Sequence, residues 1–276
     1  MRAPRGLAVD AATCNAGGME QTSSMPMEGI HNFRDYGGYP SRLGGYVRRG
    51  LLFRSGQHVE ASDTDLAAIH ALRIRTVIDL RGNGERERNP CRRYEGWDGE
   101  VVFFDGETSS SPPHEAAAAS DITPGYAEQR MQSVYTRMPD NPAMRSIFGT
   151  YLRVLAERDG GSLVHCFAGK DRTGMAVYLL HHILGVSADD ARRDYMQTNT
   201  AETTHILERQ SIPHLEERYG TLDDDAKRAL LEVRIEYLER FLDQVAKEYL
   251  TLDDYIERAL DVDDAVVDRL RERFLT

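Results

Sequence analysis

The chain has 276 residues, of which 41% are hydrophobic and 29% charged, as is typical of a globular protein with one substantial domain or two small ones. The formal net charge of -11 argues against nucleic acid or an acidic membrane as a partner, so an anionic substrate would need a local positive site. Three cysteines are too few for a disulfide framework, and no apolar run reaches the roughly eighteen residues of a membrane span, so we expect a cytoplasmic protein.

The N-terminal part of the chain divides into a tail and a predicted hairpin. Residues 1–27 are small, polar and aperiodic, which indicates a flexible tail, and their apolar stretch is too short for a secretion signal. Residues 30–56 predict a β-hairpin, with a Gly-Gly turn and residues 46–53 as the returning strand. We expect Arg34 and Asp35 to brace this hairpin rather than to touch an active site.

The next two elements bring charged residues to the edge of a predicted sheet. Ser62, followed by early acidic residues, predicts a helix over residues 62–72. Residues 74–80 form a nearly continuous apolar run, which is typical of a central parallel strand covered on both faces. Because ligands of such sheets bind at the carboxyl ends of the strands, Asp79 and Arg81 are expected near the site.

The middle of the chain alternates between loops and regular elements. Residues 83–93 carry four arginines and predict a charged loop, which is either solvated or a basic rim that attracts phosphate groups. Residues 100–104 predict a short strand, and residues 106–123, rich in Ser, Pro and Ala, predict a mobile loop. Apolar positions three and four apart predict helices over residues 124–138 and 141–157.

The whole chain is organised around one loop, residues 166–172, which we call the signature loop. A short apolar run precedes it and the apolar residues 175–180 follow it, so the pattern predicts strand, tight loop and helix. A loop that opens a helix favours anions, because free backbone N–H groups and the helix dipole both attract negative charge. Only helices are predicted beyond it: one capped by Ser187, then residues 202–218, 230–250, 252–260 and 263–274.

The signature loop carries the residue types that phosphate chemistry needs. Cys166 lies where amide dipoles and basic side chains favour the thiolate, a nucleophile at neutral pH. Arg172 can bind two phosphate oxygens and follow their charge into the transition state, so no metal or cofactor is needed. Thr173 is placed to hydrogen-bond the sulfur, and His165 to order the loop. The expected phosphate-binding residues are Phe167, Ala168, Gly169, Lys170, Asp171 and Arg172.

Cysteine, five residues and arginine, with His before and Thr after, resembles the signature of the cysteine-dependent protein tyrosine phosphatases. The run Gly-Lys-Asp-Arg-Thr-Gly resembles that of their atypical bacterial branch. The resemblance extends from about residue 30 to the end of the chain. It rests on five further segments: residues 32–38, 52–55, 78–81, 191–199 and 234–238.

The resemblance implies an α/β fold over residues 28–276, with a central, mostly parallel sheet flanked by helices and a helical C-terminal half. It also implies a hydrolase that forms a cysteinyl phosphate and acts on phosphotyrosine, phosphoserine, phosphothreonine and phosphoinositides. Helices within residues 199–232 would form a lid over the active site, and ordinary scaffold packing is the alternative. A relative in this branch is exported without a standard signal, so export of that kind stays open beside a cytoplasmic location.

The leaving oxygen needs a proton, and three carboxylates compete to supply it. Asp171 lies inside the signature loop, where the resembling branch also carries an aspartate. Asp79 ends the central strand, and Asp105 opens the loop in which related phosphatases keep their acid. We rank them in that order. The alternative role for Asp171 is a brace that holds Arg172 through a charge-assisted hydrogen bond.

Other functions stay open on the sequence. The substrate is either a phosphorylated protein or a small phosphorylated molecule such as a phosphoinositide, a nucleotide or a sugar phosphate. Lys170 is consistent with inositol rings, because lipid phosphatases that act on them carry a lysine at this position. A catalytically inactive phosphoprotein-binding module is disfavoured because Cys166 and Arg172 are both present. Sulfur transfer by a rhodanese-like domain would not account for the residues that follow the cysteine.

Overall fold

The structure is a computed structural model, and it describes residue 25, residues 27–108 and residues 123–276. The predicted N-terminal tail lies almost entirely outside these residues, as does most of the loop predicted at residues 106–123. The features discussed below therefore belong to the region in which the sequence resembles a phosphatase.

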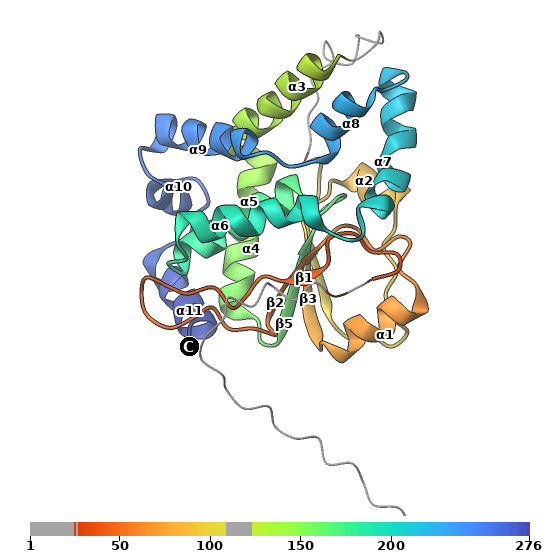
Figure 1. Cartoon of the computed structure of the whole chain (residues 1–276). Helices are drawn as coiled ribbons and strands as arrows, with labels where there is room; N and C mark the ends of the chain where they lie inside the picture. Colours follow the sequence, from red (N-terminus) through yellow and green to blue (C-terminus); the bar gives the residue numbers. More distant parts are fainter. Residues whose placement is uncertain (1–24, 26, 109–122) are drawn as a thin grey trace, which may run out of the picture.

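A five-stranded sheet in the order β1-β2-β5-β3-β4 forms the centre of the molecule (Figure 1). β1 (Arg34–Asp35) pairs antiparallel with β2 (Leu52–Ser55), as the predicted hairpin requires. The other strands run parallel to β2: β5 (Gly161–His165), β3 (Ile74–Asp79) and β4 (Glu100–Phe103). The predicted α/β fold with a mostly parallel sheet is confirmed.

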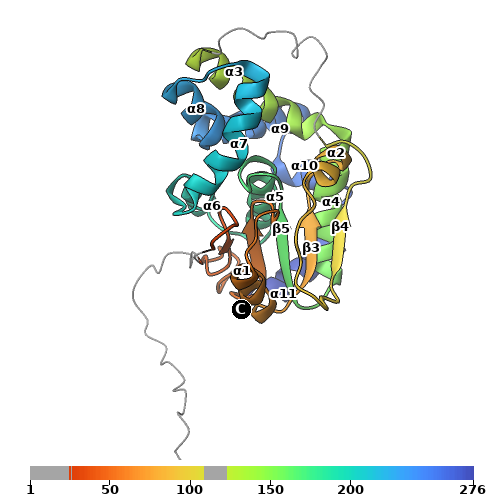
Figure 2. The same ribbon diagram turned by 90° about the vertical axis from the view of Figure 1, so that its right-hand side faces the viewer.

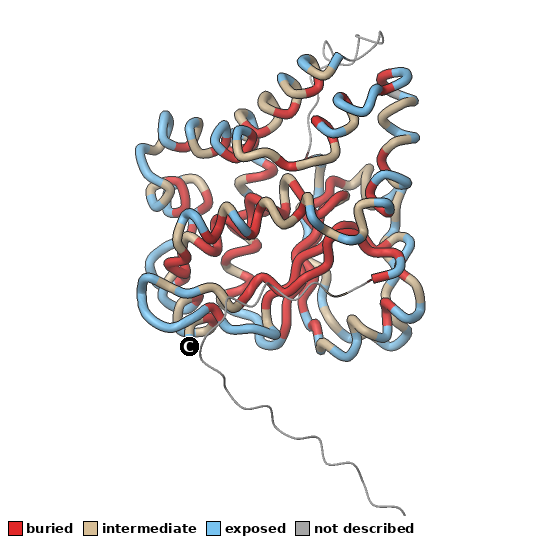
Figure 3. The backbone as a smooth tube through the Cα atoms, viewed as in Figure 1, coloured by how far each residue is buried: buried red, intermediate tan, exposed pale blue. Residues whose placement is uncertain are grey.

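The two faces of the sheet bury separate hydrophobic clusters, because successive side chains of a strand point to opposite faces. Val77 and Leu163 belong to the smaller cluster, with Leu66 of α1 (Asp63–Ala71). Their chain neighbours Ile78 and Val164 belong to the larger cluster, formed with the helices on the other face. Burial on both faces explains why these central strands are apolar almost throughout (Figure 3).

Helices make up most of the rest of the described chain, and none of the described helices is long and apolar enough to cross a membrane. α3, α7 and α8 gather at one end of the molecule (Figures 1 and 2). The helices after α1 are α2 (Asn83–Arg88), α3 (Pro124–Arg137), α4 (Pro142–Glu157), α5 (Asp171–Ile183), α6 (Ala188–Met196), α7 (Thr204–Tyr219), α8 (Asp224–Leu231), α9 (Ile235–Tyr249), α10 (Leu252–Arg258) and α11 (Asp264–Phe274), with 3-10 turns at Met138–Asp140 and Gln197–Thr200.

Two predicted elements differ from the structure near the N-terminus. The strand predicted over residues 46–53 pairs as a strand only from Leu52, and Tyr46 is 59% exposed. Val47 bridges instead to Leu275 near the C-terminus. Residues 83–93 were predicted as a charged loop, but part of this stretch is the helix α2. The N–H of Gly82, which caps the start of α2, donates to the Glu85 carboxylate at 3.1 Å.

The helix predicted over residues 230–250 is broken into α8 and α9, because a distant side chain satisfies the backbone of the turn between them. The Asn199 amide donates to the carbonyl of Val233 at 2.7 Å and accepts from its N–H at 2.8 Å. The periodicity of residues 230–250 contains no sign of this partner, since it lies about thirty residues earlier.

We predict that Asn199→Ala lowers the free energy of unfolding by about 2 kcal/mol, because it leaves two backbone groups of Val233 without their partner. Urea denaturation followed by circular dichroism measures this change. Thr200→Ala is the matched control, since the exposed Thr200 hydroxyl bonds only locally to Gln197, and it should cost less than about 0.5 kcal/mol. Equal costs for the two variants would contradict the assigned role of Asn199.

Candidate active site

The signature loop joins the end of β5 to the start of α5 and is packed tightly against the segment after β2. Gly169 has φ of +68°, a left-handed conformation that glycine adopts without strain. A Cβ atom there would lie 2.4 Å from the backbone nitrogen of Gly56, so no side chain fits. The N–H of Gln57 donates to the carbonyl of Phe167 at 2.9 Å. These contacts fix the curvature of the loop.

A buried charge cluster holds the same loop from behind. The carbonyl of Gly169 accepts from the Asn32 amide at 2.9 Å and from the Arg54 guanidinium at 3.0 Å. Asp194 pairs with Arg54 at 2.7 Å and with Arg34 at 3.3 Å. Burial opposes ionisation of Asp194, but the two guanidinium groups outweigh it and lower the pKa of this carboxyl to about 2. The cluster therefore stays charged and keeps the loop carbonyl in place.

Arg34 and Asp35, which are neighbours in β1, act on different parts of the molecule. Asp35 accepts from the N–H groups of Gly37 at 2.8 Å and Gly50 at 2.6 Å, so it braces the hairpin as expected. The prediction was wrong for Arg34, which extends to Asp194 of α6 and so belongs to the support of the signature loop. Alternating side-chain directions along a strand explain the difference.

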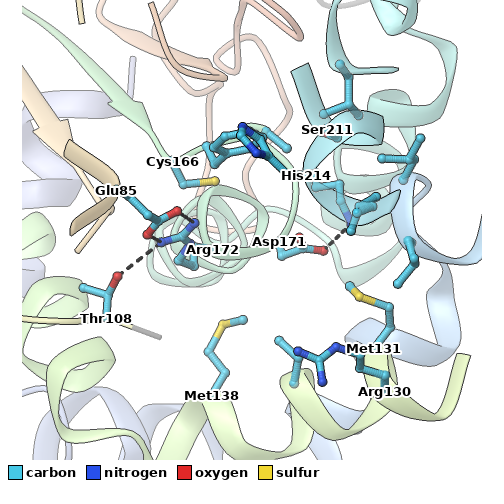
Figure 4. A pocket seen from close by; sticks show the side chains of 18 of the residues that line it. Glu85, Thr108, Arg130, Met131, Met138, Cys166, Asp171, Arg172, Ser211 and His214 are labelled. Atoms are coloured by element: carbon cyan, nitrogen blue, oxygen red, sulfur yellow. Dashed lines mark hydrogen bonds and ion pairs between the residues drawn. The ribbon is translucent and has the colours of Figure 1, made fainter. Parts of the chain in front are cut away.

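Cys166 and Arg172, at the two ends of the signature loop, line one pocket of about 740 Å³ (Figure 4). Arg172 is held by a bidentate ion pair to Glu85, with N–O distances of 2.6 and 2.7 Å, and it also donates to Thr108 at 3.2 Å. Burial disfavours the charge on Arg172, but Glu85 outweighs it and raises the pKa of the guanidinium. The positive charge is therefore fixed in position beside the sulfur.

Sequence reasoning missed Glu85, because an acidic residue in an arginine-rich stretch is usually solvated. The available signal was its position: residues 83–93 begin just beyond the carboxyl end of β3, where ligands of parallel sheets bind. The basic character predicted for this stretch survives in part, since Arg88 of α2 lines the pocket.

His165 and Asp79 lie beneath the loop and contact each other. His165 Nδ1 is 3.2 Å from the carbonyl oxygen of Cys166, and its Nε2 is 3.6 Å from the Asp79 carboxylate. Asp79 is also paired with Arg81 at 2.7 Å. Burial opposes its ionisation, but His165 and Arg81 outweigh burial and lower the pKa of Asp79 to about 2. Asp79 thus anchors the strand end as a carboxylate, without a proton to transfer at neutral pH.

Within the described part of the chain, one group of residues could hold a metal ion: Asp79, Cys91 and His165. Their possible ligand atoms lie within 4.8 Å of one another. The Arg81 guanidinium already binds two of them, donating to Asp79 at 2.7 Å and to the Cys91 sulfur at 3.1 Å. The chain therefore supplies its own cation at this position. Cys91 serves as a hydrogen-bond acceptor here.

Of the aspartates in the described part of the chain, Asp171 alone lines the pocket. Its Oδ1 atom accepts from the Tyr135 hydroxyl at 2.7 Å and from the Lys170 ammonium at 2.9 Å. Asp171 is the first residue of α5. Among the three competing aspartates, Asp171 lines the same pocket as Cys166, and Asp79 and Asp105 do not.

Two other predicted site residues make no contact with the sulfur. Asp105 is exposed and accepts a hydrogen bond from Asn83 at 2.9 Å. The Thr173 hydroxyl is buried and has no hydrogen-bond partner among the described residues, so the expected bond to Cys166 is not formed in this conformation.

The walls of the pocket combine apolar and basic side chains. α3, α7 and α8 all contribute to it, and α8 also packs against α3. Residues of α3 that are one, four, seven and eight positions apart bring one side of this helix to the cavity. The described residues that form these walls are Arg130, Met131, Val134, Arg137 and Met138 from α3 and its end, Leu207, Ser211, His214 and Leu215 from α7, and Leu230 and Leu231 from α8.

The sheet, the tight loop and the fixed arginine define an α/β phosphatase fold. Residues 25–276 match the model of the tyrosine phosphatase family, and the chain belongs to that family. The chain is therefore a tyrosine-phosphatase-like phosphoric monoester hydrolase whose substrates are phosphorylated molecules.

Two curated relatives and a solved structure resemble the chain to different degrees. A Cupriavidus necator protein whose name describes it as a tyrosine-protein phosphatase is 30% identical to this chain over 272 residues. The match covers 94% of this chain and 91% of the relative. The triple specificity protein phosphatase PtpB of Mycobacterium tuberculosis is 29% identical over 279 residues, which cover 89% of this chain and 96% of PtpB. The core catalytic domain of the yeast PP-IP phosphatase SIW14 is 12% identical, covers 85% of this chain and 98% of its own, and has a TM-score of 0.27, too low to support an inference.

We predict that the free energy of unfolding falls as the pH is lowered from 6.5 towards 4. Burial lowers the pKa of His165 to about 4, although Asp79 partly opposes this, and burial likewise lowers the pKa of His31 to about 4. Between pH 6.5, the ordinary pKa of histidine, and pH 4, the lowered pKa in the folded chain, the unfolded chain binds a proton at each ring and the folded chain does not. Each histidine should therefore remove about 1.4 kcal/mol per pH unit within this window.

Urea denaturation at half-unit intervals of pH tests this dependence. His165→Asn should reduce its slope, whereas His70→Asn should leave the slope unchanged because the His70 side chain is exposed. A constant free energy of unfolding between pH 6.5 and 5 would contradict the prediction.

Proposed function

We propose that the chain hydrolyses phosphomonoesters through a cysteinyl-phosphate intermediate on Cys166. The sulfur attacks phosphorus while the bond to the leaving oxygen breaks, and Arg172 balances the charge on the phosphoryl oxygens. Water then attacks phosphorus, phosphate leaves and the thiolate is restored. The observation that carries this proposal is the bidentate Glu85–Arg172 pair, which holds a guanidinium in the same pocket as Cys166 before substrate binds.

Asp171 is the proposed general acid. It lines the pocket beside Cys166, whereas Asp79 is a buried carboxylate paired with Arg81 and Asp105 is exposed. In the first step Asp171 gives its proton to the leaving oxygen, and in the second it takes a proton from the attacking water. Its place at the start of α5 keeps it within the loop that would bind the phosphate.

Broad specificity is the second part of the proposal: phosphotyrosine, phosphoserine, phosphothreonine and phosphoinositides. A pocket of about 740 Å³ is far larger than one phosphate group requires. In a chain with a net charge of -11, Arg88, Arg130, Arg137 and Lys170 all line it. With Arg172 these basic residues outnumber the acidic lining residues Glu85, Asp171 and Glu217 by five to three. This local excess of positive charge favours substrates with a second anionic group, such as a polyphosphorylated ring.

We also propose that residues 199–232 serve as a lid. α7 and α8 contribute apolar side chains to the pocket wall, among them Leu207, Leu215 and Leu230. A cover of this kind would exclude water from the thiolate and protect it from oxidation.

We predict that Cys166→Ser lowers phosphate release by about a thousandfold or more, because the hydroxyl is not ionised at neutral pH. Release is measured with a chelator present, using phosphotyrosine and phosphoserine peptides, phosphoinositides and nucleotides. Cys91→Ser is the matched control, since Cys91 does not line the pocket. Undiminished release by Cys166→Ser would refute the thiolate mechanism, and no release by folded wild-type protein from any of these substrates would favour a binding module.

We predict that Arg130→Ala and Arg137→Ala each raise KM for a polyphosphorylated inositol ring by about tenfold and for a monophosphate by less than about threefold. The reason is that both guanidinium groups line the pocket away from the signature loop. Arg240→Ala is the control for net charge, because Arg240 contacts α3 through Gln132 without lining the pocket. Equal changes of KM for both substrates would show that these arginines do not bind a second anion.

A further inference from the structure

Two buried tyrosines form a hydrogen-bonded chain that ends on Asp171. The Tyr135 hydroxyl of α3 lies 2.7 Å from Asp171 Oδ1, and the Tyr195 hydroxyl of α6 lies 2.8 Å from that of Tyr135. Both side chains are almost completely buried, with exposed fractions of 0% and 1%. Phenols placed here have a role beyond filling space, because apolar phenylalanine would fill the same volume without a polar group to satisfy.

The chain of hydroxyls has a definite direction. The carboxylate oxygen of Asp171 can only accept, so Tyr135 donates its single proton to it. Tyr195 must then be the donor in the bond between the two hydroxyls. Because Lys170 also donates to Oδ1, at 2.9 Å, this oxygen already has two donors. A proton carried by Asp171 is therefore directed to its other oxygen, Oδ2.

We propose that Tyr135, supported by Tyr195, is a positioning residue for the general acid, and that it directs the transferable proton of Asp171 to Oδ2. This inference rests on the proposed function, in which Asp171 protonates the leaving oxygen. The phenols are suited to the task because they occupy Oδ1 without bringing another charge to the site. Lys170 alone could rotate about its flexible side chain, whereas two packed rings hold one orientation.

The phenols keep their protons under working conditions. Burial, followed by the nearby Asp171 charge, raises the pKa of Tyr135 well above its usual value, and burial likewise raises that of Tyr195. The charged and titratable groups that face Asp171 come from the signature loop and from four helices. They are Lys170 and Arg172 from the signature loop and the start of α5, Tyr135 from α3, Tyr195 from α6 and Tyr237 from α9.

Tyr135→Phe tests the inference with two esters that differ in their need for an acid. For phenyl phosphate, a poor leaving group, kcat/KM should fall by about tenfold, and for p-nitrophenyl phosphate by less than about twofold. The alkaline limb of kcat/KM against pH should also move to higher pH by about half a unit, because a carboxylate that has lost a donor holds its proton more tightly. A purely structural role would not move this limb.

Matched variants separate positioning from general loss of packing. Tyr151→Phe is the control, because Tyr151 and Tyr36 form another buried pair of hydroxyls at 2.8 Å that does not contact Asp171. Tyr151→Phe should change kcat/KM for both esters by the same factor. Tyr195→Phe removes only the second hydroxyl of the chain. It should lower kcat/KM for phenyl phosphate about threefold more than for p-nitrophenyl phosphate. This variant keeps the test available if Tyr135→Phe is poorly folded.

The double variants decide the outcome. In an Asp171→Asn background, Tyr135→Phe should have no further effect on either ester, since the proton that it positions is absent. An equal fall for both esters, or a full additional fall in that background, would overturn the positioning role while leaving Asp171 as the acid. If Asp171→Asn itself affects both esters equally, the acid assignment fails and the positioning role fails with it.

Discussion

The active site depends on one buried carboxylate. Asp194 lies between Arg34 and Arg54, and Arg54 passes the contact to the carbonyl of Gly169. A buried ion pair of this kind adds little net stability, but removing one partner leaves an uncompensated charge and costs about 3–5 kcal/mol. Its value lies in geometry: it ties strands β1 and β2, helix α6 and the signature loop together, and so fixes the curvature of the loop that we propose binds phosphate.

A positive charge that is fixed inside the pocket allows an acidic protein to accept an anionic substrate. The net charge of -11 is spread over the chain, whereas Arg172 is held rigidly by Glu85 inside the pocket. A positive group that is already oriented needs no reorganisation when charge develops, and the low local dielectric strengthens its effect. In the proposed mechanism, fixing one guanidinium therefore matters more than the overall sign of the surface charge.

Sequence patterns predicted the features that are encoded locally. The apolar runs of β3 and β5, the Ser62 cap of α1 and the strand–loop–helix around Cys166 each need only a short window of residues. The patterns failed where the partner is distant. Glu85, Tyr135 and the break between α8 and α9 depend on side chains that meet only in the folded chain, and periodicity carries no information about such contacts.

Asp194 and Tyr195 are neighbours on α6, yet they act on different groups of the signature loop, the Gly169 carbonyl and the Asp171 carboxylate. Successive residues of a helix point about 100° apart, so one helix can contact two separate structures. Asp194 fixes the carbonyl of Gly169 through Arg54, and Tyr195 contacts Asp171 through Tyr135. The position of the loop backbone and the orientation of its carboxylate are thereby set by the same rigid element. A shift of α6 would therefore disturb both contacts, although the Asn32 amide also holds Gly169 and the Lys170 ammonium also holds Asp171.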